Sequence, residues 1–177
     1  MSRIPLASAD QQPEPIRQWM ARRGNLNVFR LLANAPQVFR GWTQMVDELF
    51  DSPTFDLRTR EAIILRVAQL QASRYELAQH TGIARAAGLT EQQIDAIRDS
   101  GDLEATGFSA TERSALDVTT ELVSTHRLRD DTFAAAQAVF GDEALTELLM
   151  IISCYYGLAL VLNAVDLDVD ATARFQP

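Results

Sequence analysis

The sequence predicts an all-α protein, a bundle of about eight helices with short connections. Apolar residues recur at the helical period over most of the chain, and no run alternates apolar and polar residues as a half-buried strand would. Three segments of the form Ser/Thr-x-x-Glu/Gln, beginning at Ser73, Thr90 and Ser109, predict helix starts. Glycine and proline punctuate other boundaries, as expected between helices.

The N-terminal part is expected to hold an extended arm and three helices. Residues 1–15 carry three of the six prolines among polar neighbours, which favours an arm. Pro15 could open the first helix, and Gly24 would end it. The segment 34–36 then separates two further helices, the second of which should reach about Asp51.

Two helices are expected in the middle of the chain. Pro53, after Ser52, is predicted to restart the chain as a helix, because proline is favoured in the first helical turn. Residues 57–71 carry an apolar stripe with the helical period. A helix that begins at Ser73 should end at Gly88, a typical glycine stop.

The C-terminal part is expected to be helical as well. Helices should begin at Thr90 and Ser109, Gly141 should end a short helix, and Asp142 should begin an apolar one. The apolar stretch 148–165 is about as long as a membrane span, but a glycine and an asparagine interrupt it. We therefore expect a buried central helix and no membrane partner.

The bulk composition restricts the partners and the compartment. The length of 177 residues suggests one helical domain, residues 25–177, preceded by residues 1–24 as an arm and first helix. The net charge of −8, without a basic run, disfavours nucleic acid and anionic membranes. The chain starts without the apolar core of a signal peptide, and Cys154 is its single cysteine, so we expect a cytoplasmic protein without disulfides.

Glu61 and His80 are the first candidates for chemistry. If the chain reverses between residues 70 and 73, both residues lie about equally far from the turn, on facing antiparallel helices. Their side chains could then meet directly or through a water. A carboxylate beside an imidazole orients the ring and raises its basicity, so that His80 can exchange a proton near neutral pH.

Other side chains near the same helix start could join this pair. Glu76 and His80 are four residues apart and share a helix face, and Tyr75 could offer a phenol. Backbone N–H groups of residues 74–76 would favour an anionic group of a substrate. Each residue also has a structural reading: Ser73 and Glu76 as a capping box, Tyr75 as a core residue, and His80 as a satisfied core histidine.

A metal centre is not expected from the sequence. The chain has two histidines and no cysteine cluster, although carboxylates leave a metal site open. His126, near a predicted helix end, is read as a C-terminal capping charge.

Glu61, Ser73, Glu76 and His80 occupy the positions of a Glu, a Cys-x-x-Cys pair and a His. This order is found in the carboxymuconolactone decarboxylase and alkylhydroperoxidase D-like family, which the chain resembles over about residues 25–167. The resemblance implies the alkylhydroperoxidase D-like helical bundle and a homo-oligomer, a trimer or hexamer, with sites near subunit contacts. Both cysteines of the pair are absent, which argues against thiol-dependent peroxide reduction.

The segment 75–80 resembles the aromatic-Glu-Leu-x-x-His segment of the decarboxylase branch. This resemblance implies a cofactor-independent lyase or isomerase acting on a small carboxylated or lactone substrate. His80 would be the general acid/base, Glu61 its orienting partner, and Tyr75 and Glu76 substrate-contacting residues. The alternative is a non-catalytic binding or assembly member of the family, in which the bond between Glu61 and His80 is structural. Alkylhydroperoxidase activity ranks last.

Overall fold

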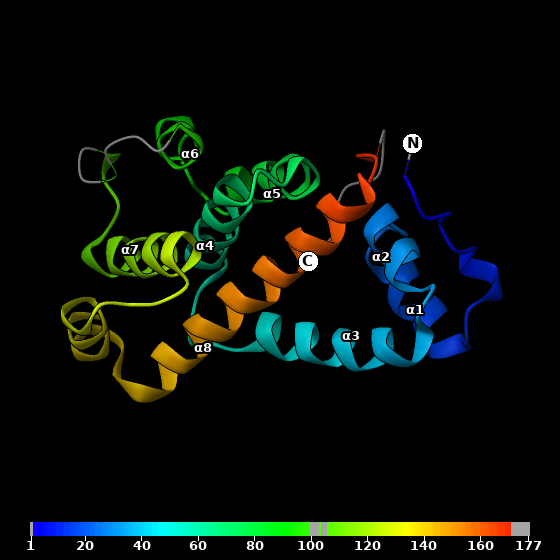
Figure 1. Ribbon diagram of the computed structural model, residues 1–177, viewed down its shortest axis with the longest axis horizontal. Helices are drawn as coiled ribbons and strands as arrows, with labels where there is room; N and C mark the ends of the chain where they lie inside the picture. Colours follow the sequence, from blue (N-terminus) through cyan, green and yellow to red (C-terminus); the bar gives the residue numbers. More distant parts are fainter. Residues whose placement is uncertain (1, 100–102, 104–105, 171–177) are drawn as a thin grey trace. The chain divides into compact units, whose positions relative to one another are not determined.

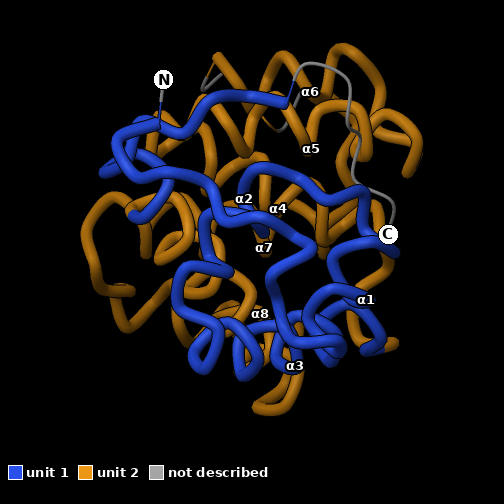
Figure 2. Tube along the Cα trace, turned by 90° about the vertical axis from the view of Figure 1, so that its right-hand side faces the viewer, with its two compact units in different colours: residues 1–52, 161–177 blue, residues 53–160 orange. Residues whose placement is uncertain are grey.

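The computed structural model describes residues 2–99, 103 and 106–170. In that part of the chain it contains eight α-helices and one 3₁₀ helix but no strand (Figure 1), which confirms the predicted all-α class. The chain forms two compact units, residues 1–52 with 161–177 and residues 53–160 (Figure 2). The predicted division at residue 24 stays a prediction.

The first unit is built around an aromatic cluster. Trp19 packs edge-on against Phe29 and Phe39, with ring centroids 4.8 and 5.6 Å apart. Its indole N–H donates to the Asp47 carboxylate at 2.9 Å, which satisfies the polar end of a buried ring. The helices of this unit are α1 (Glu14–Arg22), α2 (Asn27–Leu32) and α3 (Pro36–Asp51), close to their predicted bounds.

The expected N-terminal arm is non-helical apart from a short 3₁₀ helix, η1 (Ala9–Gln11). Its backbone is bound to the region of α2. The Ala7 N–H donates to the Arg30 carbonyl at 3.0 Å, and the Asn34 side chain donates to the Pro5 carbonyl at 2.9 Å. The arm is therefore an ordered part of the first unit.

The second unit surrounds α4. All side chains from Arg60 to Ala68 in this helix are buried, which explains why its apolar residues are not confined to one stripe. The unit contains α4 (Leu57–Leu70), α5 (Arg74–Ala86), α6 (Glu91–Arg98), α7 (Ala110–Thr125) and most of α8 (Asp130–Val165). Its apolar core includes Ala62, Leu65, Ala84, Leu89, Ile94, Ile97, Phe108 and Leu116.

The start of α4 differs from the prediction. The helix begins at Leu57, not at Pro53. Asp56 is its N-cap residue, and its carboxylate accepts the Thr59 N–H at 2.8 Å. Hydrogen bonding with the Thr59 side chain lowers the pKa of Asp56, and the bond from the Thr59 backbone N–H lowers it further. The Asp56 carboxylate satisfies a backbone N–H in the first turn of the helix. A helix that began at Pro53 would leave its first N–H groups to water.

Two of the three predicted capping boxes are present, at Thr90 and Ser109. The one predicted at Ser73 is wrong, because the Ser73 side chain makes no capping hydrogen bond. The backbone explains the failure. The Ser73 N–H already donates to the Ala68 carbonyl at 2.8 Å, so it is not available to donate the reciprocal bond to Glu76.

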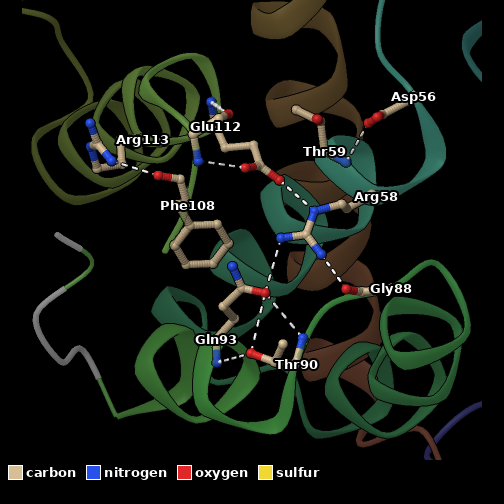
Figure 3. Close-up of polar contacts among 10 residues, drawn as sticks. Asp56, Arg58, Thr59, Gly88, Thr90, Gln93, Phe108, Glu112 and Arg113 are labelled. Carbon is tan, nitrogen blue, oxygen red and sulfur yellow. Dashed lines mark hydrogen bonds and ion pairs between the residues drawn. The ribbon is translucent and has the colours of Figure 1, made fainter. Parts of the chain in front are cut away.

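The two capping boxes are joined by Arg58 of α4 (Figure 3). Its guanidinium donates to Glu112 at 2.7 Å and to Gln93 at 2.9 Å, and these are the reciprocal residues of the two boxes. It also donates to the carbonyl of Gly88, the residue after the C-cap residue of α5. One side chain of α4 thus holds the starts of α6 and α7 and the end of α5.

Helix α8 is interrupted where the sequence predicts a break. Gly141 has φ 70° and ψ 177°, which separates residues 130–140 from residues 142–165. Among the described residues, this is one helix long and apolar enough to cross a membrane by length and composition. Its most apolar 18-residue window is 44% buried. Met150 and Leu160 are 46% and 51% exposed, so the predicted central helix has an uncovered face.

Candidate functional site

The turn between α4 and α5 brings the candidate residues together. Ala72 lies in the left-handed region at φ 49°, and its N–H donates to the Gln69 carbonyl at 3.0 Å. With the Ser73 bond to Ala68, these contacts form a Schellman motif that ends α4. The chain reverses as predicted, and α5 begins at Arg74.

Glu61 and His80 meet directly across this reversal. The His80 Nδ1 and the Glu61 Oε2 are 2.9 Å apart. Glu61 is fully buried and His80 is 9% exposed, so the contact lies in the interior of the second unit. A carboxylate on Nδ1 selects the tautomer with its proton there, so Nε2 is the nitrogen suited to exchanging a proton.

The protonation of His80 reflects opposing effects. Burial disfavours the charged ring and lowers its pKa. The Glu61 carboxylate and its hydrogen bond raise the pKa, Glu76 adds to this, and the net shift is upward. His80 therefore keeps its proton to a higher pH than an exposed histidine does.

Tyr155 of α8 forms a further wall of the site. Its ring stands edge-on to the His80 ring, with centroids 5.3 Å apart. Burial raises the pKa of Tyr155 well above its usual value, and the charges of Glu61, Cys154 and Glu76 raise it further. Sequence reasoning did not place Tyr155 in the site. A tyrosine in an otherwise apolar helix was the available signal, but only the fold sets it against His80.

Glu76 is the unusual group of the site. Its side chain is 2% exposed, and neither carboxyl oxygen has a hydrogen-bond partner in the described part of the chain. Burial raises its pKa to about 7, while the nearby Ser73 hydroxyl and the His80 ring lower it in part. Glu76 can therefore hold or release a proton near neutral pH.

Tyr75 is buried at the start of α5, with 4% of its surface exposed. Neighbouring residues on a helix point about 100° apart, so Tyr75 and Glu76 leave α5 in different directions. Its role in contacting a substrate stays a prediction. Arg60 is also buried, and its guanidinium donates to the Phe55 carbonyl at 2.7 Å.

A surface hollow of about 700 Å³ in the second unit is lined by other residues. They belong to α7 and to the start of α8 and include Asp117, Glu121 and Thr132. Glu121 accepts a hydrogen bond from the Arg129 N–H at 2.9 Å. Among the described residues, no group of three or more His, Cys, Asp or Glu side chains is placed to hold a metal ion.

His126 occupies the C-cap position of α7, in a left-handed conformation with φ 61°. Its ring faces Tyr156 edge-on, with centroids 6.1 Å apart. His126 therefore lies at the end of α7, where the sequence predicted a helix end.

The helical fold, with a Glu–His pair across the α4–α5 turn, defines the class of the protein as alkylhydroperoxidase D-like. Residues 36–121 match the carboxymuconolactone decarboxylase family, in agreement with the resemblance found in the sequence. It lacks the Cys-x-x-Cys pair, with Ser73 and Glu76 at those positions. No protein of curated function matches the chain.

Several solved structures share this fold. The chain is similar to an alkylhydroperoxidase AhpD core, peroxidase-related protein from Ralstonia eutropha JMP134, with a TM-score of 0.83 and 21% identity over 96% of this chain and 93% of that one. A peroxidase-related protein from Silicibacter sp. TM1040 gives a TM-score of 0.81 and 17% identity over 96% and 92%.

A third similar structure is a variant of the debrominase Bmp8, with a cysteine replaced by alanine, in complex with 2,3,4-tribromopyrrole. It has a TM-score of 0.79 and 18% identity, over 96% of this chain and 91% of that one. At these identities the likeness shows the fold, and these structures carry different descriptions of activity. The reaction of this chain has to be argued from its own side chains.

Proposed function

We propose that the protein is a cofactor-independent acid–base enzyme, a lyase or isomerase that acts on a small carboxylated or lactone molecule. The observation that carries this proposal is the buried 2.9 Å contact between Glu61 and His80. A carboxylate that orients an imidazole is an arrangement suited to proton transfer near neutral pH.

The neighbouring groups support separate acid and base roles. Glu61 holds the Nδ1 proton, and Nε2 of His80 gives or takes a proton at the substrate. In a decarboxylation, the bond to the carboxyl group breaks, its electron pair stays on the carbon, and His80 donates a proton there as carbon dioxide leaves. Solvent then restores the proton on His80.

Glu76 could serve as a second proton carrier. Its pKa of about 7 differs from that of an ordinary carboxyl group and lets it hold or release a proton at neutral pH. Titratable neighbours whose surroundings push their pKa values apart are typical of acid–base sites. Glu76 also stands at a position where a peroxidase relative would have a cysteine, which favours proton transfer over thiol chemistry.

The family and the sequence support the substrate class. The matching family takes its description from a decarboxylase of a carboxylated lactone. The aromatic-Glu-Leu-x-x-His segment that begins at Tyr75 resembles the decarboxylase branch. Tyr75 and Glu76 are the residues proposed to contact the substrate.

The test compares the chain's two histidines. Wild type, His80→Gln and His126→Gln are incubated in D₂O with carboxylated lactones, and ¹H NMR follows decarboxylation and exchange of carbon-bound hydrogen. We expect His80→Gln to lose activity by about 100-fold or more, the usual effect of removing an acid–base group. His126→Gln, the matched control, should retain it.

Equal activity of wild type and His80→Gln would contradict the proposal. Wild type that leaves all of these substrates unchanged, while His80→Gln only lowers the melting temperature, would favour the non-catalytic binding member. Rapid consumption of peroxide with a dithiol donor would instead favour a peroxidase.

A further inference from the structure

Three side chains beside the Glu61–His80 contact leave buried oxygen atoms without hydrogen bonds in the described part of the chain. These atoms are Oε1 of Glu61, Oγ of Ser73 and both carboxyl oxygens of Glu76; the Ser73 hydroxyl is a donor beside Glu76 and lowers the pKa of that carboxyl group. Glu61 and Ser73 are fully buried, and Glu76 is 2% exposed. Buried polar atoms are nearly always hydrogen-bonded, because leaving them unpaired is costly. A concentration of such atoms points to a binding partner.

These oxygens belong to one location in the second unit. Ser73 and Glu76 lie about one turn apart at the start of α5, and the Ser73 hydroxyl influences the pKa of Glu76. His80 also influences Glu76 and contacts Glu61 directly. The charges of both glutamates act on Tyr155. We name the oxygens of Glu61, Ser73 and Glu76 the acceptor patch.

The balance of protons and lone pairs decides what the patch can bind. An ionised Glu61 only accepts hydrogen bonds, Ser73 has one proton to donate, and Glu76 has one only when it is protonated. Acceptor positions therefore outnumber donors. A ligand carboxylate would add further acceptors and a like charge, whereas an O–H or N–H group would supply the missing protons.

We infer that the acceptor patch binds an O–H or N–H donor group of a small neutral ligand. This inference rests on the proposed function, because it names the group that the same site recognises. A substrate that also carries a carboxylate would direct that carboxylate away from Glu61 and Glu76.

The test uses three probes of similar ring size. Phenol has an O–H donor, anisole replaces that proton with a methyl group, and benzoate is an anion. Wild type is titrated with each probe, and ¹H–¹⁵N NMR follows the backbone amides of Ser73 and Glu76. We expect phenol to bind at least about 10-fold more tightly than anisole, because anisole leaves the patch unpaired. Benzoate should bind more weakly than phenol.

Two substitutions assign the preference to the patch. Glu76→Leu removes two acceptor oxygens, and Ser73→Ala removes a single hydroxyl. Two variants are used so that one can still be measured if the other does not fold. Each should reduce the ratio of the affinity for phenol to the affinity for anisole, to about 2-fold or less in Glu76→Leu. Glu91→Leu, on the exposed face of α6, is the control and should keep the wild-type ratio.

Equal affinity for phenol and anisole, tighter binding of benzoate, or no response to any probe would overturn the inference. So would a phenol preference that survives in every folded variant of Glu76 and Ser73. Binding is measured without turnover. If the wild type prefers phenol to anisole but catalyses no reaction, only the proposed reaction is contradicted. If it catalyses the reaction but shows no preference for phenol, only this inference is contradicted.

Discussion

Glu76 shows how one residue can connect stability to function. A buried carboxyl group favours its neutral form, and burial raises the pKa of Glu76 to about 7, although the Ser73 hydroxyl and the His80 ring lower it in part. In the unfolded chain the same group ionises near its usual value of 4.5. The folded protein therefore binds more protons than the unfolded chain between these two values, so folding loses free energy as the pH rises through this range.

We predict that the free energy of unfolding falls by about 3 kcal/mol between pH 4.5 and pH 8 because of Glu76. His80 adds a loss of the same sign, because its raised pKa stabilises the fold below about pH 6.5, and this contribution disappears as the pH exceeds the folded-state pKa. Urea unfolding at a series of pH values measures both. Glu76→Gln should remove most of the decrease in the free energy of unfolding between pH 4.5 and pH 8.

Glu91→Gln is the control for this experiment, since Glu91 is an exposed partner of Arg85. It should leave the slope between pH 4.5 and pH 8 as in wild type. A wild-type stability that is constant or rises over this range would show that Glu76 is ionised and well solvated in the folded protein.

The α4–α5 turn is the element on which the site depends. It uses Ala72 at φ 49°, a conformation that costs an L-residue about 1–2 kcal/mol and that glycine adopts freely. At the other end of α5, Gly88 occupies the equivalent position at φ 98°. The protein thus uses glycine at one end of α5 and tolerates alanine at the end that leads to the site.

Ala72→Gly should stabilise the protein by roughly 0.5–1 kcal/mol, since relief of the left-handed strain exceeds the added freedom of the unfolded chain. Chemical unfolding measures the change. Ala87→Gly is the matched control, because Ala87 ends α5 in the right-handed region, at φ −75°. This control should destabilise, and a destabilised Ala72→Gly would contradict the strain argument.

Arg58 acts at the level of elements, because it holds Gly88, Gln93 and Glu112 (Figure 3). Arg58→Met should destabilise the second unit by roughly 2–4 kcal/mol, since charge-assisted hydrogen bonds are lost at a partly buried site. Arg58→Lys should retain less than half of the stability that Arg58→Met loses, because an ammonium group cannot reproduce the geometry of the guanidinium. Urea unfolding measures both, and Arg98→Met, at an exposed position of α6, should stay within about 0.5 kcal/mol of wild type.

At the scale of the whole molecule, α8 presents an uncovered stripe. Met150, Ser153, Gly157 and Leu160 are exposed and recur at intervals of three or four residues, so they share one side of the helix. A stripe that combines apolar and small residues suits close packing against another helix. We propose that this stripe is buried in a homo-oligomer, as the family resemblance implies.

Light scattering after size exclusion should give a mass that is a multiple of 19.7 kDa, with a trimer or hexamer expected. Met150→Glu should shift the mass toward the monomer, because the interface would bury an unpaired charge. Val38→Glu, at a residue of α3 that is 75% exposed, is the matched control and should leave the mass unchanged. A wild-type monomer at high protein concentration would contradict the proposal.

Local sequence signals predicted much of the fold because they act over a few residues. The capping boxes at Thr90 and Ser109 formed, and the breaks at Gly88 and Gly141 lie where glycine predicted them. The box at Ser73 failed because a hydrogen bond to the preceding turn had already taken its N–H. Local patterns do not record such competition.

Sequence patterns alone predicted the helical class and placed Glu61 and His80 at equal distances from an expected turn, because period, caps and spacing are properties of nearby residues. The direct contact between Glu61 and His80 is seen in the folded structure. The packing of the helices was needed to show that Tyr155 stands against His80 and that the Glu76 carboxyl group is buried beside Ser73 and His80. Burial and long-range contact depend on which helices pack together, and they set the pKa values from which the proposed chemistry follows.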